Sequence, residues 1–185
     1  FLDYFIKNII LEKRFYMIQI EFIGMAGSAK TTSAGILYEK LKKIKQKKVL
    51  YINNFLFESS SQIIRYVYYL ILLIFSLFLD PKSLVGSLFT LIKIRINIMI
   101  SLNYLHQLSV LIILDKFSKL IHINDQGIIQ AVISLVASSE NKINKKYLKR
   151  LLIPKYLPLF LVKTYAPDYV CFLRIKKRND KKKSR

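Results

Sequence analysis

The sequence contains little cysteine, and this scarcity limits the kinds of site it can build. Cys171 is the single cysteine, so an intramolecular disulfide and a zinc site built on cysteines are both excluded. One unpaired thiol fits a reducing compartment, and we expect the protein in the cytoplasm. The first eleven residues contain Asp3 and have no basic segment ahead of their apolar positions, unlike a secretory signal peptide.

Acidic residues are also scarce, since 11 carboxylates face 31 lysines and arginines and the formal net charge is +20. Such a charge often indicates a nucleic acid or another polyanionic partner. Here the bias runs through the whole sequence, and the basic clusters at 40–48, 142–150 and 174–185 lack the interleaved aromatic residues of RNA-binding motifs. Nucleic-acid binding is therefore not expected.

The apolar run 66–79 is shorter than the roughly 20 residues that a membrane-spanning helix needs. We predict a helix buried in a soluble protein, and a membrane-embedded or interfacial helix is the alternative, since the mean hydropathy is +0.31. Residues 92–98 alternate with period two, which alone indicates a strand. Isoleucine is so common here that the alternation carries little weight, and we predict a helix over 82–106.

Two of only five glycines lie at positions 24 and 27, between an apolar segment and a helical one. We predict a strand over 16–23, a loop over 24–29 and a helix from Thr31 to Lys43. This order, ending in Lys30-Thr31-Thr32, is that of a phosphate-binding loop. The alternative is an ordinary turn made of small residues.

The chemistry of phosphate binding explains these residue types. Glycines let backbone N–H groups approach a triphosphate, the Lys30 ammonium reaches its β- and γ-phosphates, and the Thr31 hydroxyl binds Mg²⁺. The usual motif has a third glycine where this chain has Ala29, which adds a Cβ to the loop. The predicted nucleotide-binding residues are Gly24, Met25, Ala26, Gly27, Ser28, Ala29, Lys30, Thr31 and Thr32.

A second acid-bearing segment lies at 120–127, where an apolar strand ends in Asp125 and a glycine and an amphipathic helix follow. This is where a P-loop enzyme places a magnesium-organising carboxylate. Asp115, at the end of the apolar segment 111–115, is a rival, but it lacks the following glycine and falls in a predicted helix. A third interpretation is that Asp125 only caps the next helix.

The remaining segments complete an α/β pattern within one domain over residues 1–185. The two histidines, His106 and His122, have no acidic partner at ligand spacing, and we interpret both as structural. The other predicted elements are a leading helix at 1–14, a strand at 49–52, a basic helix at 145–152, a buried parallel strand at 168–175 and a basic tail at 174–185.

Taken together, residues 24–32, the Asp125-Gln126-Gly127 segment and Pro167-Asp168 resemble the P-loop kinases of the thymidylate-kinase-like group. The resemblance covers roughly residues 16–178. It implies a three-layer α/β sandwich whose parallel sheet has the order 2-3-1-4-5, incomplete here at its C-terminus. It also implies transfer of the ATP γ-phosphoryl group to a nucleotide, a nucleoside or another small acceptor.

The resemblance assigns roles by position. Lys30 and Thr31 would hold phosphate and Mg²⁺, and Asp125 would organise the metal through water. Glu58 is the candidate on the acceptor side, although the Asp-Arg signature of thymidylate kinases is missing, and Arg174 and Arg178 are candidates for a basic lid. The alternatives are a nucleotide-binding protein without kinase activity and a membrane-associated protein.

Overall fold

The computed structural model describes residues 18–44, 49–52, 62–118, 120–139 and 143–183. Within them, four parallel strands form one sheet in the order β2-β3-β1-β4. The strands are β1 (Ile18–Ile23), β2 (Val49–Ile52), β3 (Ile121–Asn124) and β4 (Phe160–Lys163). The helices are α2 (Lys30–Lys43), α3 (Gln62–Leu79), α4 (Pro81–Ile94), α5 (Ile98–Phe117), α6 (Ile128–Ser138), α7 (Lys145–Leu151) and α8 (Asp168–Lys183), with a 3-10 turn η2 (Pro154–Tyr156).

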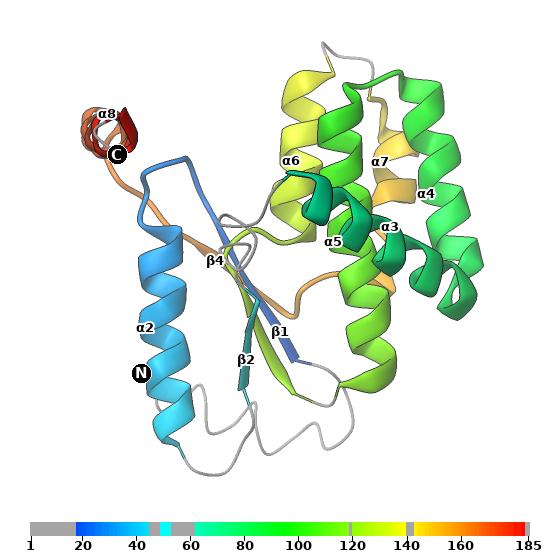
Figure 1. Cartoon of the computed structure of the whole chain (residues 1–185), viewed down its shortest axis with the longest axis horizontal. Coiled ribbons are helices and arrows are strands. Elements are labelled where there is room, and N and C mark those ends of the chain that lie inside the picture. The colour runs from blue at the N-terminus through cyan, green and yellow to red at the C-terminus, as the bar shows by residue number, and fades with distance from the viewer. Residues whose placement is uncertain (1–17, 45–48, 53–61, 119, 140–142, 184–185) are drawn as a thin grey trace.

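The chain is therefore an α/β protein with helices on both faces of a parallel sheet, as predicted. Figure 1 shows α2 on one face and the helices around α5 and α6 on the other. The α2 face is closed by Ala34 and Leu41, which pack on apolar side chains of β1 and β3. The central strand β3 is buried along its whole length, and parallel sheets are normally covered on both faces in this way.

The second core lies among the helices and centres on α5. Tyr104, Leu108 and Ile112 of this helix are fully buried and pack against α4, α6 and α7. Helix α5 is long and apolar enough to cross a membrane, but half of its most apolar window is buried inside the fold. Its composition is therefore accounted for by its place in the core.

The single helix predicted over 82–106 is wrong in one respect, because the structure has two helices there. Helix α4 ends at Arg95, whose backbone is left-handed with φ 55°, and Asn97 caps α5 by accepting a hydrogen bond from the Met99 N–H at 2.8 Å. The period-two alternation of 92–98 spans this break. A strand is excluded there, as predicted, and the asparagine cap explains why the helix restarts.

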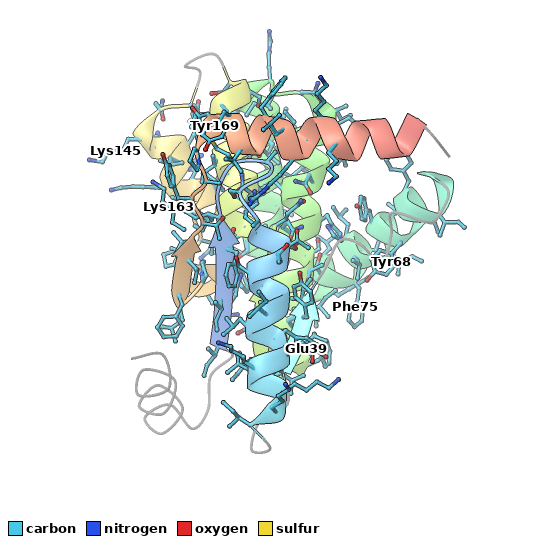
Figure 2. All side chains as sticks on the ribbon, turned by 90° about the vertical axis from the view of Figure 1, so that its left-hand side faces the viewer. Glu39, Tyr68, Phe75, Lys145, Lys163 and Tyr169 are labelled. Carbon is cyan, nitrogen blue, oxygen red and sulfur yellow. The ribbon has the colours of Figure 1, made fainter. Side chains whose placement is uncertain are left out.

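The run 66–79 is helical, as predicted, but the prediction that it is buried is wrong. Helix α3 packs on α5 through one side, where Ser76 Oγ donates to Ser109 Oγ at 2.9 Å and the Tyr69 ring contacts the His106 ring in a tilted arrangement with 4.1 Å between ring centroids. Its other side is exposed, and Phe78 is 81% accessible. In Figure 2, α3 lies at the right-hand edge of the molecule, where Tyr68 and Phe75 are labelled.

The strand predicted at 168–175 is a further error, since these residues begin helix α8. The helix begins where the Pro167 carbonyl accepts hydrogen bonds from the N–H groups of Val170 and Cys171. The negative charge of Asp168 in the first turn interacts favourably with the helix dipole. The fourth strand is instead β4, a four-residue segment that the sequence analysis did not identify. The leading helix 1–14 and the first residues of the predicted strand 16–23 lie outside the described residues.

Candidate functional site

The loop formed by residues 24–29, here called the glycine loop, joins β1 to α2 with the backbone conformations that glycine permits. Gly24 has φ 155° and Gly27 has φ 83°. A Cβ on Gly24 would lie 2.6 Å from the Ser28 hydroxyl and from Thr164, and a Cβ on Gly27 would lie 2.6 Å from the Cys171 carbonyl oxygen. Both positions therefore require glycine, for conformation and for space.

Ala29 adopts the left-handed conformation directly before α2, with φ 70° and ψ 23°. An L-residue with a Cβ is strained there by roughly 1–2 kcal/mol relative to its ordinary conformations. The sequence motif places glycine at this position, and the structure supplies the physical reason. The chain retains the loop shape despite the alanine.

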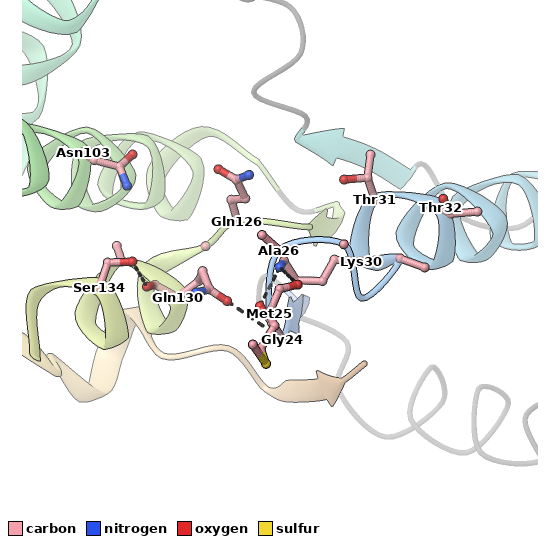
Figure 3. Close-up of a pocket in the computed structure, with 14 residues that line it drawn as sticks. Gly24, Met25, Ala26, Lys30, Thr31, Thr32, Asn103, Gln126, Gln130 and Ser134 are labelled. Carbon is pink, nitrogen blue, oxygen red and sulfur yellow. Dashed lines mark hydrogen bonds between the residues drawn. The ribbon is translucent and has the colours of Figure 1, made fainter. Parts of the chain in front are cut away.

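Lys30 folds back over the glycine loop instead of pointing into solvent. Its Nζ donates hydrogen bonds to the carbonyl oxygens of Gly24 at 2.6 Å and Met25 at 2.9 Å (Figure 3). The ammonium group is thus held at the loop, where an anion on the loop would meet it. Thr31 and Thr32 follow in the first turn of α2, whose free N–H groups and dipole favour negative charge.

Asp125 lies directly after β3 and is 3% exposed. Its Oδ1 atom is buried and has no hydrogen-bond partner among the described residues. Tyr51 at the end of β2 links this carboxylate to α2: its hydroxyl donates to the Thr31 carbonyl oxygen at 3.2 Å. The pKa of Tyr51 is raised to about 12, first by burial and then by the charge of Asp125 and a hydrogen bond to it.

Glu21, in the middle of β1, has a fully buried carboxylate that anchors the start of α6. Its two oxygens accept the N–H groups of Ile129 at 3.1 Å and Gln130 at 2.8 Å. A Cβ on Gly127 would lie 2.5 Å from this carboxyl group, so only glycine fits there. Burial raises the pKa of Glu21 to about 7, against the lowering effect of the backbone N–H groups.

The same contact brings a polar face of α6 to the glycine loop. Gln130 Oε1 accepts a hydrogen bond from the Gly24 N–H at 3.3 Å, and Ser134 Oγ donates to the Gln130 carbonyl at 3.0 Å. A cavity of about 350 Å³ opens between this face, the glycine loop and α5. Its lining includes Lys30, Thr31, Thr32, Asn103, Gln126, Gln130 and Ser134, and most of them are labelled in Figure 3.

A second cavity of about 530 Å³ adjoins the first on the β4 side of the glycine loop. It is formed by Ile133 of α6, the segment 163–166 after β4, and Gly24, Met25 and Gln130, which also line the first cavity. Ser28 Oγ and Thr164 Oγ1 lie 2.8 Å apart and join the loop to the end of β4. The loop is therefore bordered by open space on two sides.

Helix α8 closes the outer edge of the glycine loop. The backbone of Cys171 lies against Gly27, and Arg174 Nη1 donates to the Gly27 carbonyl at 2.9 Å. Arg174 was expected after a strand in a basic lid, and it lies instead within α8, at the loop. The backbone of Arg178 is one turn further along α8, and the described part of the structure does not include its side chain.

Other candidate residues lie apart from this site. Asp115 is in α5, as predicted, and forms an ion pair with Lys155 at 2.8 Å. His106 and His122 are buried, which lowers the pKa of each to about 4, and both pack in the interior as expected of structural residues. Glu58 lies outside the described residues.

The sequence analysis missed Glu21 and the polar side of the cavity. Glu21 sits inside an apolar strand, a place where a carboxylate signals a buried partner but does not identify it. Gln130 and Ser134 are spaced four residues apart, which places them on one face of the largely apolar helix α6, and Gln126 lies just before its start. That spacing was available in the sequence and could have identified the cavity wall.

Replacing Ala29 with glycine should stabilise the fold. Glycine removes the conformational strain that alanine has in the left-handed backbone, and it also increases the entropy of the unfolded chain. Because the first effect is the larger, we expect Ala29→Gly to raise the unfolding free energy by about 0.5–1 kcal/mol. Ala26→Gly is the matched control, because Ala26 is in the same loop without a positive φ and should lose about 0.5 kcal/mol. Denaturant unfolding measures both, and an Ala29→Gly variant no more stable than wild type would contradict the strain at this position.

Glu21 should make stability fall as the pH rises. Its folded-state pKa of about 7 exceeds the ordinary value of 4.5, so between these values the folded state binds more protons than the unfolded state. The unfolding free energy should therefore drop by about 3 kcal/mol from pH 4.5 to pH 7 through this group alone. The two buried histidines act in the opposite direction, which makes the comparison with a variant necessary.

The unfolding free energy of the Glu21→Gln variant, measured by denaturant at several pH values, should not show the decrease with rising pH that Glu21 causes in the wild type. Glu39→Gln is the control, since Glu39 is an exposed carboxylate on α2. It should leave the pH dependence unchanged. Parallel pH profiles for wild type and Glu21→Gln would show that folding does not raise the pKa of Glu21.

Comparison of the sequence with known proteins found no family model that matches it, and no curated protein matches it either.

Proposed function

We propose that this protein is a P-loop kinase-like phosphotransferase that binds Mg-ATP at the glycine loop and transfers the γ-phosphoryl group to a small acceptor. One observation carries the proposal. The glycine loop, Lys30 and the start of α2 follow β1, and the buried carboxylate of Asp125 follows the neighbouring strand β3. Helix N-termini and glycine loops bind phosphate through backbone N–H groups, and a lysine there adds a compact positive charge. The parallel sheet is consistent with this type of protein.

The residues around Thr31 fit a magnesium ion. Asp125 has a buried oxygen without a partner, and its charge raises the pKa of Tyr51, whose hydroxyl donates to the Thr31 carbonyl oxygen. The described residues contain no cluster of three or more His, Cys, Asp or Glu side chains that could hold a metal alone. This suits Mg²⁺, which prefers one or two protein ligands with water and phosphate oxygens. When bound, the ion would neutralise the phosphates, with Thr31 as its direct protein ligand and Asp125 holding it through water.

The acceptor would occupy the cavity opposite the loop, in contact with α5 and α6. Asn103, Gln126, Gln130 and Ser134 offer amide and hydroxyl groups that can both donate and accept hydrogen bonds. Positioning by such groups, rather than covalent chemistry, is what phosphoryl transfer chiefly requires. Arg174 lies at the edge of the glycine loop on α8, and its guanidinium group would contact phosphate oxygens from that side.

A second candidate function is nucleotide binding without transfer. The observation favouring it is that no carboxylate is among the described residues lining the cavity, so none there would accept a proton from an acceptor hydroxyl. The nucleotide would then act as a regulatory or structural ligand. The two functions share the loop and differ in turnover.

Nucleotide binding should depend on Lys30. A ligand that binds only the folded state raises its stability, so millimolar Mg-ATP or Mg-GTP should shift the thermal transition of the wild-type protein upward. Lys30→Ala should abolish this shift. Lys40→Ala is the matched control, because Lys40 is an exposed lysine of the same helix, and its variant should keep the shift. An unshifted wild-type transition would remove the main support for the proposal.

Phosphoryl transfer should depend on Asp125 more than nucleotide binding does. Asp125→Asn is nearly isosteric and removes the charge, so we expect metal-dependent turnover to fall by about two orders of magnitude or more while nucleotide affinity changes much less. Asp115→Asn is the control, since Asp115 lies on α5 and forms an ion pair with Lys155. Turnover lost in the Asp115 variant and kept in the Asp125 variant would reverse the assignment, and binding without turnover in wild type would favour the second candidate.

A further inference from the structure

Helix α3 exposes a continuous apolar stripe on the side opposite its contact with α5. The members are spaced three and four residues apart, which places them on one face of the helix. They are Val67, Leu70, Ile71, Ile74, Phe75 and Phe78, with exposures from 45% to 81%. Residues 66–79 contain no charged side chain. Isolated apolar residues are normal on a surface, but a regular stripe of this length marks an interaction site.

The neighbouring helix α4 repeats the pattern. Its inner side is buried in the helical core, yet Val85, Leu88, Phe89 and Ile92 are exposed at the same helical spacing. At the far end of α3, Phe75 stacks on the exposed Phe117 of α5 at 5.8 Å. We name the exposed apolar side chains of α3 and α4, with Phe117, the apolar face.

The unpaired charges that the described part of α4 and the residue after it place beside the apolar face are positive. Between residues 62 and 114 the only carboxylate is Asp80. It is already engaged, because it accepts hydrogen bonds from Tyr156 at 2.6 Å and from Ser83. Lys82, Lys93 and Arg95 of α4 are exposed. A partner that covers this face therefore meets apolar side chains and cations, and α3 and α4, as the structure describes them, add no unengaged carboxylate.

We propose that the apolar face docks on the surface of an anionic lipid bilayer. Helices that lie in the membrane interface combine phenylalanine and aliphatic residues on one side with lysine and arginine nearby, and they bind through apolar burial together with attraction to anionic headgroups. Helix α3 supplies the first component and the cations of α4 supply the second. The net charge of +20 adds attraction over the whole molecule.

Charge complementarity favours a lipid surface over a second copy of the chain. Two copies would bring together two molecules of charge +20 through a face on which the described residues of α3 and α4 offer no free carboxylate to pair with Lys82, Lys93 or Arg95. Anionic headgroups neutralise those cations, each worth about 1 kcal/mol near a charged membrane. The attachment is peripheral, because α3 packs along α5 and exposes only one side.

Vesicle flotation of the full chain tests this inference independently of nucleotide binding. Phosphatidylcholine vesicles and vesicles that also contain phosphatidylglycerol are the two probes. We expect partitioning to anionic vesicles at least about tenfold stronger than to neutral ones, and weaker binding at high salt. Ile71→Ser combined with Phe78→Ser should reduce this partitioning about tenfold or more.

The control variant combines Ile36→Ser with Phe172→Ser, two exposed apolar residues on α2 and α8. It should bind anionic vesicles like wild type. Lys82→Gln with Lys93→Gln should weaken anionic binding while leaving the thermal transition unchanged. Three results would overturn the inference: no wild-type flotation, equal loss in the control variant, or a self-association that disappears in the α3 variant without any vesicle binding.

Discussion

The buried carboxylate of Glu21 holds the two halves of this structure together. It lies in β1, within the sheet, and accepts two N–H groups from the first turn of α6, which belongs to the helical half. A carboxylate accepting backbone N–H groups at a helix N-terminus is stabilised by both hydrogen bonding and the helix dipole. Gly127 packs directly against the Glu21 carboxyl group, and this contact fixes the position of α6. The position of α6 in turn places Gln126 and Gln130 in the wall of the cavity.

Most of the α/β pattern could be predicted from the sequence because strong local signals agreed with the tertiary structure. The segments 18–23, 30–43, 49–52 and 121–124 combine apolar runs with clear breaks. The strand prediction for 168–175 was wrong because the apolar and aromatic residues there resemble those of a strand. In the structure Tyr169, Phe172 and Leu173 are exposed on α8, and only Cys171 is buried against the loop. The true strand β4 is as short as β2 and β3, and the sequence analysis did not identify it.

The candidate site was predictable where chemistry depends on adjacent residues and not where it depends on contacts between distant ones. Residues 24–32 and Asp125 carry their own local pattern. The contacts of Glu21 with α6, Tyr51 with Thr31, and Arg174 with Gly27 join residues 20 to 147 positions apart. No local pattern encodes such pairs. The left-handed Ala29 also shows that a loop can keep its shape when one motif residue is replaced, at a cost in conformational energy.

The apolar face and the cavity are joined by one helix, α5. On one side α5 contacts α3 through the buried Ser76–Ser109 hydrogen bond and the tilted Tyr69–His106 ring contact, and on another it places Asn103 at the cavity. Breaking the buried Ser76–Ser109 hydrogen bond would remove a partner from each of two buried hydroxyl groups, which opposes separation of the two helices. Helices α3 and α5 are therefore packed together through both polar and aromatic contacts. A bilayer bound to α3 would fix the orientation of the cavity relative to the membrane, so that a small molecule at the membrane surface would always meet the same side of the glycine loop.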